Sequence, residues 1–582
     1  MSHFLQTYTL SYTPLSPIHI GSGDSYEPAN YVIDDGTLYE FDSGGVLTAL
    51  TEQDRDELNN IVSGRANAAM LMKVQRFFYQ RRDELKPWAI NSIPVLKGVE
   101  NYYRERIGKP SNVEGDGSEV IAKLAIDRTA INPVTRQPVL FGSSIKGAIR
   151  TALLDHVNAG RSLTDRDADL FRLEGLRQDE RKRREREQRN VFPRLNQRLL
   201  GFRAGHFELD PLRLLQIGDA AYQMRDSLPA MQVYLSVNRK KELKRDKHGK
   251  EIFSQAEGNE NLCRRLECSS AWRYRAFSGR LNLQNLADIE QSEKLPNPDS
   301  TFTIRQIAQY CNDHYRKILD DELEAMRKRG FLDAGWDRCL QTLLDNAADK
   351  FAQGRAFLVR VGRHSGAEAV TLDGVRHIKI MKGNPEYQPH TKTLWLAAET
   401  KDQRENLLPF GWLLVEIHPG DGEPADWPEL AELCAAQQGP ARQWAEKQAR
   451  QQAETASKRQ ADEQRRQQEE IARQQRQAEE QAAAQAAEQA RLAEQQRLAQ
   501  LSPIELEFET LLKSLPPAEH DTALLRELEN GRWQGEDAKI VAQKIKALME
   551  QARKWMPDFA GDNKQKVKLK QRSQKVCQYL QD

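Results

Sequence analysis

The sequence has few cysteines and no long apolar run, and both absences narrow what the chain can be. Its six cysteines, spread from Cys263 to Cys577, form no Cys-x-x-Cys pair and lack the histidine spacing of a zinc site. A disulfide framework is equally unexpected, which favours a reducing compartment. No window of about 18 apolar residues occurs, and no basic segment followed by an apolar one opens the chain. We therefore expect a soluble, cytoplasmic protein without a metal, a cofactor or a membrane partner.

The chain also lacks an excess of either charge. Its 86 Lys and Arg residues balance 85 Asp and Glu residues, which leaves a formal net charge of +1. The net charge of the whole molecule therefore provides no long-range attraction to a polyanion, so any surface that binds nucleic acid must be a local basic patch. A length of 582 residues suffices for about three or four domains. With 39% hydrophobic residues, these domains can each form a hydrophobic core.

One glycine, two serines and two cations mark the start of a predicted helix. Gly142 permits a tight turn after a buried strand, and Ser143 or Ser144 can cap the helix that follows. Helix N-termini attract phosphate through unpaired N–H groups and the helix dipole. Lys146 and Arg150 lie four residues apart and share one helix face. This face can grip an anion, although a capped amphipathic helix with two surface cations explains the pattern equally well.

The same stretch does not fit a nucleoside triphosphate loop. Gly142 and Gly147 have the glycine spacing of that loop. The loop then requires Lys and Ser or Thr, for the terminal phosphates and the magnesium ion. Ala148 and Ile149 occupy those positions, so we reject an NTPase.

Two further glycine stretches follow predicted strands. Near the N-terminus, Ile18-His19-Ile20 leads into a glycine turn at residues 21 to 23. In the second half, the strand of residues 356–361 leads into Gly362-Arg363-His364-Ser365-Gly366. The repeated order of strand, glycine turn and helix suggests two related α+β units.

The stretches Ile18-His19-Ile20-Gly21-Ser22-Gly23 and Phe141–Leu154 together resemble the RAMP superfamily of CRISPR-associated proteins. Within it, they resemble the family of fifth subunits of type III-A (Csm) effector complexes. The resemblance covers residues 4–418. Its third feature is the Val361–Gly366 loop with the Phe410–Ile417 closing strand, which is similar to a degenerate form of the family's glycine-rich loop. It implies ferredoxin-like (RRM-like) cores whose glycine loops and first helix hold the crRNA. It also implies a position near the 3′ end of the crRNA, contacts with other Csm subunits and target RNA, and crRNA maturation through recruited host nucleases.

The chain departs from the family pattern at the position that carries cleavage of target RNA, which argues against that activity. Related subunits cleave with an Asp in the loop before the strand that here is Tyr31–Ile33, and this chain has Pro28-Ala29-Asn30 in that loop. We therefore expect a non-catalytic RNA-binding subunit for antiviral defence. The predicted RNA-binding residues are His19, Gly21, Ser22, Gly23, Gly142, Ser143, Ser144, Lys146, Gly147, Arg150, Lys240, Lys241, Lys244, Arg245, Gly362, Arg363, His364 and Ser365.

Two other functions remain open. In a metal-independent CRISPR-repeat endoribonuclease, His19 would act as general acid or base, and Lys146 or His364 would stabilise the phosphorane. A structural role for His19 is the simpler interpretation. In a scaffold protein, the C-terminal helices would be presented to a partner.

The predicted fold is α+β, with tandem ferredoxin-like domains at residues 1–235 and 236–425. A hairpin turn is expected at Asp34-Asp35-Gly36, because Asp-Gly tolerates the positive φ that a two-residue turn requires. Helices are expected at residues 53–86 and, from an apolar stripe, at about residues 304–326. The stretch 207–222 is expected to be strand-like, and a basic hairpin tip is expected around residues 239–250. Ala, Gln, Glu and Arg fill 51 of the 60 positions from 441 to 500, which predicts a long helix within residues 426–501. Because it has few large apolar residues, a solvated spacer is favoured over a coiled coil. Residues 502–582 regain helical periodicity and predict a small basic bundle.

Overall fold

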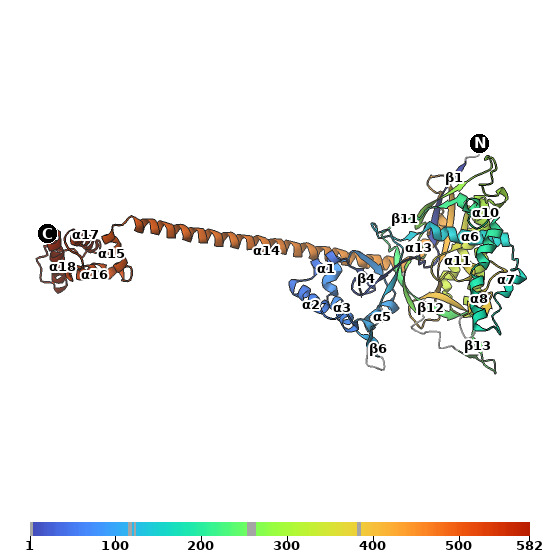
Figure 1. The fold of residues 1–582 in the computed structure, drawn as a ribbon, viewed down its shortest axis with the longest axis horizontal. Helices are drawn as coiled ribbons and strands as arrows, with labels where there is room; N and C mark the ends of the chain where they lie inside the picture. The colour runs from blue at the N-terminus through green and yellow to red at the C-terminus, as the bar shows by residue number, and fades with distance from the viewer. Residues whose placement is uncertain (1–3, 114–118, 122–123, 253–262, 381–385, 582) are drawn as a thin grey trace. The chain divides into compact units, whose positions relative to one another are not determined.

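The computed structural model describes residues 4–113, 119–121, 124–252, 263–380 and 386–581 (Figure 1). The chain divides into two compact units, Met1–Arg459 and Gln460–Asp582. The first unit combines helices with largely antiparallel sheets, which confirms the predicted α+β class. Among the described residues, no helix is long and apolar enough to cross a membrane.

The larger sheet of the first unit has the N-terminal strand in its middle. β1 pairs antiparallel with β16 on one side and with β22 on the other, so Tyr12 faces both Phe277 and Val415 in register. All three side chains are buried in the main hydrophobic core. The spatial order is β17 (Ala356–Arg360), β22 (Trp412–Pro419), β1 (Leu5–Pro14), β16 (Phe277–Gln284), β11 (Ala220–Tyr222) and β9 (Val139–Leu140), with β10 (Leu215–Ile217) also paired to β16.

The second sheet carries one of the glycine stretches at its edge. Its order is β2 (Gly21–Tyr26), β8 (Ile126–Thr129), β15 (Arg264–Ser269), β12 (Met231–Lys240), β20 (Thr393–Ala398) and β21 (Leu408–Pro409). β12 runs through residue 235, and both large sheets contain strands from either side of that position. The chain before and after residue 235 therefore shares its sheets.

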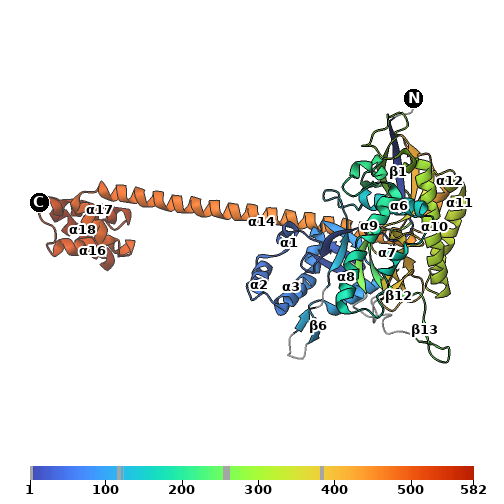
Figure 2. The same ribbon diagram turned by 45° about the vertical axis from the view of Figure 1, so that its right-hand side comes forward.

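A lobe of residues 27–125 is inserted between the paired strands β2 and β8 (Figures 1 and 2). Its sheet is β3 (Tyr31–Asp34), β4 (Thr37–Glu40) and β5 (Asn91–Pro94). Asp35 and Gly36, both at positive φ, form the predicted two-residue hairpin turn. The helix expected at residues 53–86 is divided. The remaining elements are α1 (Ser43–Ala49), α2 (Glu52–Val62), α3 (Ala68–Gln80), α4 (Arg82–Leu85), α5 (Lys97–Arg106), β6 (Pro110–Val113) and β7 (Glu119–Ile121).

Helices α6 and α10 lie side by side against the main core. The Tyr315 hydroxyl of α10 donates to the backbone oxygen of Ala148 in α6 at 3.0 Å, and both residues are buried. Thr303 caps α10 through a reciprocal bond with Gln306. The helices of this part are α6 (Gly142–Asn158), α7 (Asp165–Asp169), α8 (Gln178–Gln188), α9 (Val191–Leu200), α10 (Ile304–Lys328), α11 (Ala334–Asn346) and α12 (Ala348–Ala352).

One further predicted segment differs in detail. The stretch 207–222 was expected to be extended, but 207–209 and 211–214 form 3₁₀ turns before β10 and β11. Pro211 at the start of the second turn fixes its backbone for a helical turn rather than a strand. Two short hairpins complete the unit: β13 (Lys244–Arg245) with β14 (Glu251–Ile252), and β18 (Ile378–Ile380) with β19 (Glu386–Gln388).

The long predicted helix is observed as α14 (Gly439–Ala499), which follows α13 (Pro428–Ala436). Its first turns are not a solvated spacer. The Trp444 indole and the Gln448 amide both donate to the Thr37 hydroxyl, at 3.0 and 2.9 Å. Thr37 is fully buried, and Arg459 stacks on the ring of Trp88. Residues 444–459 therefore form a brace across the inserted lobe.

The second unit ends in the predicted helical bundle, which has its own core. Its helices are α15 (Pro503–Leu512), α16 (His520–Glu529), α17 (Glu536–Gln551) and α18 (Lys564–Gln581). Phe508, Leu524, Val541 and Val576 are among the buried residues that bring all four helices together. Ser502 and Glu505 form a capping box at the start of α15.

Candidate nucleic-acid interface

In chain order, the first glycine stretch (residues 18–23) and the third (residues 362–366) meet in the structure. We call this meeting point, formed by His19, Gly21–Gly23 and Gly362–Arg363, the glycine corner. The backbone N–H of Arg363 donates to the carbonyl of His19 at 2.8 Å. Gly362 has φ +81°, and a Cβ there would lie 2.4 Å from that same carbonyl. Only glycine therefore allows these two segments to approach so closely.

The predicted glycine turn at residues 21–23 is wrong: these residues belong to strand β2. The strand has an irregular register between Gly21 and Ser25 opposite β8, and Gly23 takes up φ +89°. Residues 21–24 are all exposed, and a Cβ at Gly23 would meet no atom within 4 Å. A bulge at an edge strand thus accommodates the glycines. The result is a run of backbone that large side chains do not cover.

His19 lies beneath this exposed strand and is only 2% exposed. Its Nδ1 lies 2.7 Å from the backbone oxygen of Glu267, which orients the ring. Burial, together with the nearby Arg363, lowers the pKa of His19, so the imidazole stays neutral at physiological pH. These contacts favour the structural role for His19 over acid–base catalysis.

A buried carboxyl group lies next to His19. Glu267 is fully buried, accepts the Tyr26 hydroxyl at 2.6 Å and accepts the backbone N–H of Thr129 at 3.0 Å. Burial raises the pKa of Glu267 to about 7. Arg128 stacks on Tyr26 at 4.2 Å, and its charge partly offsets this burial. Sequence reasoning missed this network because Glu267 belongs to a strand whose pattern gives no sign of an inward carboxyl group.

The remaining residues of the third stretch have fixed positions. Arg363 forms an ion pair with Asp127 on β8, and its side chain is 37% exposed. His364, at φ +68°, stacks on the Trp395 indole with ring centroids 4.5 Å apart. Burial and the charge of Arg363 lower the pKa of His364 to about 3, so it is neutral. Ser365 is buried, whereas the Arg363 guanidinium reaches solvent beside β2.

The start of α6 differs from its prediction. The N-cap is Phe141, and neither Ser143 nor Ser144 caps the helix through its side chain. The Asp219 carboxylate instead accepts the backbone N–H of Gly142 at 2.7 Å. Glycine is needed at position 142 because a Cβ would lie 2.3 Å from the carbonyl of Ile217, not because of a turn. A carboxylate therefore already occupies part of the predicted anion site.

The two cations of α6 also have partners within the protein. Lys146 donates to the carbonyl of Leu215 at 2.7 Å, and Arg150 pairs with Asp210 at 3.2 Å. Burial lowers the pKa of Lys146. Ser143 and Gly147 are exposed, so the helix start remains reachable. In the described residues, the contacts of Lys146 and Arg150 connect α6 to residues 210–215 rather than to the glycine corner.

The basic hairpin is observed as β13 paired with β14, and several of its basic residues interact with other parts of the protein. Lys241 pairs with Glu368 at 2.8 Å, beside the loop that contains His364. Lys240 and Arg245 also have interactions within the protein. The side chain of Lys244 lies outside the described residues. Lys241 therefore lies next to the third glycine stretch. No group of three or more metal-ligating side chains is found in the part of the chain that the structure describes.

Comparisons with known proteins find one matching family and several similar solved structures. A family model described as the RAMP superfamily matches residues 11–331, which is more than half of the chain. A chain in the cryo-EM structure of a Csm–crRNA–target RNA ternary complex of a type III-A CRISPR–Cas system is 16% identical. The match covers 71% of this chain and all of that chain, with a TM-score of 0.35. The crystal structure of T. onnurineus Csm5 is 14% identical, covers 70% of this chain and 99% of that chain, and has a TM-score of 0.36. No curated protein matches the sequence.

Proposed function

The chain belongs to the RAMP superfamily, and from this premise we propose that it is a non-catalytic RNA-binding subunit of a type III CRISPR effector complex. It holds the crRNA near the 3′ end, contacts other Csm subunits and aids crRNA maturation in antiviral defence. Its core has two ferredoxin-like halves that share their sheets. The single observation that carries the proposal is the glycine corner, because it joins two of the stretches on which the family resemblance rests.

The glycine corner suits a ribose-phosphate backbone. Residues 21–24 expose strand backbone without bulky side chains, so a phosphate can approach the main chain closely. The half-exposed guanidinium of Arg363 supplies a donor and a positive charge beside it. Contacts of this kind position nucleic acid without reading its bases. They fit a subunit that must accept crRNAs of many sequences.

The test compares cations at the corner with cations on α6. Binding of a single-stranded repeat RNA is measured by fluorescence anisotropy over a range of salt concentrations. Arg363→Gln should weaken binding and lower the slope of log K against log salt by about 0.7, the value for one phosphate contact on a single strand. Lys146→Met with Arg150→Gln should leave the slope nearly unchanged, because both cations are engaged with residues 210–215.

Asp127→Asn is the matched control for Arg363→Gln. It removes the ion-pair partner but leaves the guanidinium in place, so RNA binding should stay equal or become tighter. A normal slope for Arg363→Gln would contradict the proposed role of the corner. Metal-free cleavage of the repeat RNA that is lost in His19→Ala would contradict a non-catalytic function.

A further inference from the structure

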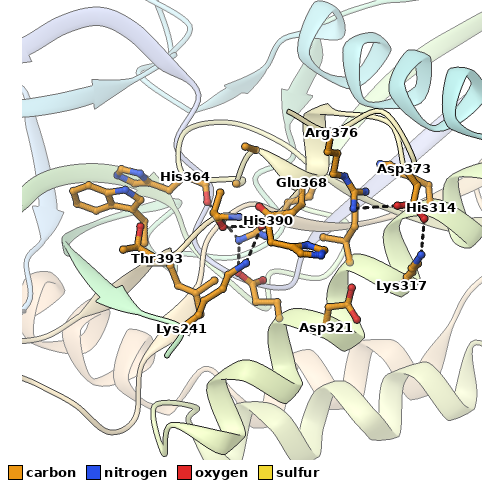
Figure 3. Close-up of a pocket in the computed structure, with 18 of the residues that line it drawn as sticks. Lys241, His314, Lys317, Asp321, His364, Glu368, Asp373, Arg376, His390 and Thr393 are labelled. Atoms are coloured by element: carbon orange, nitrogen blue, oxygen red, sulfur yellow. Dashed lines mark hydrogen bonds and ion pairs between the residues drawn. The ribbon is translucent and has the colours of Figure 1, made fainter. Parts of the chain in front are cut away.

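A polar pocket of about 290 Å³ lies between α10, the loop after β17 and β20 (Figure 3). Of the predicted RNA-binding residues, His364 and Lys241 line it. The volume is near the lower limit for sites that enclose a small organic molecule. The pocket is therefore large enough for one compact ligand but not for a folded partner.

One end of the pocket is aromatic. His364 and Trp395 stack nearly parallel, with an angle of 16° between their rings. The Ser236 hydroxyl lies 3.0 Å from His364 Nε2 and fixes the imidazole in place. Trp395 is only partly buried. A rigid, uncharged ring pair of this kind can stack with a nucleobase at little entropic cost.

The opposite end is polar and contains two buried atoms without a partner. Figure 3 shows His314, Lys317, Asp373 and Arg376 together there, away from His364. The side chain of Arg376 is 7% exposed, and its Nε has no hydrogen-bond partner among the described residues. His314 is 2% exposed; its Nδ1 lies 2.7 Å from Asp155, while its Nε2 has no partner. Unpaired buried polar atoms are costly, so a small shift of these two lining side chains toward a ligand hydroxyl group would be favourable.

The charges of the lining show which ligand fits between these ends. Lys317 pairs with Asp373 at 2.7 Å, and Lys241 pairs with Glu368 at 2.8 Å. Asp313 and Asp321 add carboxylates to the rim, so acidic groups outnumber the Lys and Arg side chains. This excess disfavours a polyphosphate. It suits the N–H and O–H donors of a base and a ribose.

We propose that the polar pocket binds one unstacked ribonucleoside, with its base against the His364–Trp395 pair and its ribose hydroxyls at the His314–Arg376 end. The ribonucleoside is supplied by the bound RNA or by a free nucleoside. The first source rests on the proposed function. A 2′-hydroxyl at the polar end also distinguishes RNA from DNA.

The experiment uses the full chain and a single-stranded RNA that carries 4-thiouridine at alternate positions. After photocross-linking, mass spectrometry identifies the attached peptide, and anisotropy measures total affinity. We expect attachment to the peptides that contain His364 or Trp395. Trp395→Leu should reduce this cross-link about 5- to 150-fold, the usual effect of losing one stacked base. Trp395→Phe keeps an aromatic ring and should retain most of it.

The outcomes separate the inference from the proposed function. RNA that binds normally but cross-links elsewhere, or equally well in Trp395→Leu, would exclude the bound RNA as the source and leave the proposed function intact; the free-nucleoside measurement then decides the inference. Substitution of 2′-deoxynucleotides should reduce the pocket cross-link, and an unchanged yield would count against the ribose position. Failure to bind any RNA would overturn the proposed function. The pocket is then tested with free adenosine and uridine by saturation-transfer NMR, where a signal lost in Trp395→Leu supports the ribonucleoside site and no signal overturns it.

Discussion

The glycine corner and the start of α6 resemble each other in sequence but differ in what already occupies them. Both place glycines and a cation next to the end of a strand. At the corner, residues 21–24 remain exposed and Arg363 reaches solvent. At α6, Asp219 takes up the Gly142 N–H, while Asp210 and Leu215 engage the two cations. A sequence motif thus indicates that donors are present, whereas the fold decides whether they are free for a ligand.

The largest expected effect comes from adding one methyl group at each site. Gly362→Ala places a Cβ 2.4 Å from the His19 carbonyl at φ +81°, and should cost about 3 kcal/mol or more of folding free energy. Gly147→Ala meets no atom within 4 Å in an exposed helical position and should stabilise by about 0.5–1 kcal/mol. Scanning calorimetry of the first unit measures both. Equal effects would remove the structural distinction between the two sites.

The second test concerns the buried carboxyl group of Glu267 beneath the corner. Its folded-state pKa of about 7 lies above the usual 4.5, so folding favours the protonated form. Its contribution to stability is complete below pH 4.5 and is lost as the pH rises to about 7, by up to about 3 kcal/mol. Urea denaturation from pH 4.5 to 8 should therefore show wild type losing stability relative to Glu267→Gln. Parallel pH profiles would mean that Glu267 ionises normally.

The third test asks whether the brace of residues 444–459 supports the lobe next to the corner. Truncation after residue 440 removes Trp444 and Gln448, and should destabilise the first unit by about 2 kcal/mol through lost burial and two lost hydrogen bonds. Truncation after residue 459 keeps the brace and should leave the melting of the first unit unchanged. Identical melting of both truncated chains would argue against the brace.

The smallest effect is expected at the start of α6. Asp219→Ala removes the acceptor for the Gly142 N–H and should cost about 1 kcal/mol. Asp219→Asn keeps an acceptor and should cost only about 0.3 kcal/mol of folding free energy, mainly because the favourable charge at the helix N-terminus is lost. RNA affinity should not change in either variant. Tighter RNA binding in Asp219→Ala would show that the helix start becomes a phosphate site once it is vacated, and would weaken the contrast with the corner.

Local signals in the sequence predicted several of the elements. The Asp35-Gly36 turn was found because few residue pairs tolerate two successive positive φ angles. Helix α10 was recognised by its apolar stripe, and α6 by the apolar face that includes Ile145 and Ile149. Such features depend on neighbours within a few residues, which is the range that a sequence pattern describes.

The long-range contacts could not be predicted in the same way. The Asp219 contact to Gly142 joins residues 77 positions apart, and Asp219 has the ordinary appearance of a surface carboxylate. Trp444 was hidden within a polar helix whose composition indicates solvent exposure. The resemblance placed the two glycine stretches in one site, but whether the site as a whole binds RNA stays a prediction. The occupants of the α6 start are set by the packing of residues 210–219, which no local pattern specifies.

The central position of β1 has a consequence for how the chain folds during synthesis. β1 is synthesised long before either of its neighbours in the sheet, β16 and β22. At ordinary translation speeds of about 5–20 residues per second, β1 waits tens of seconds for its second partner. The inserted lobe, by contrast, has its own local sheet and can form early. In a newly made chain, β1 therefore lacks both sheet partners for a long interval, and its core side chains Leu10 and Tyr12 cannot yet be buried between them.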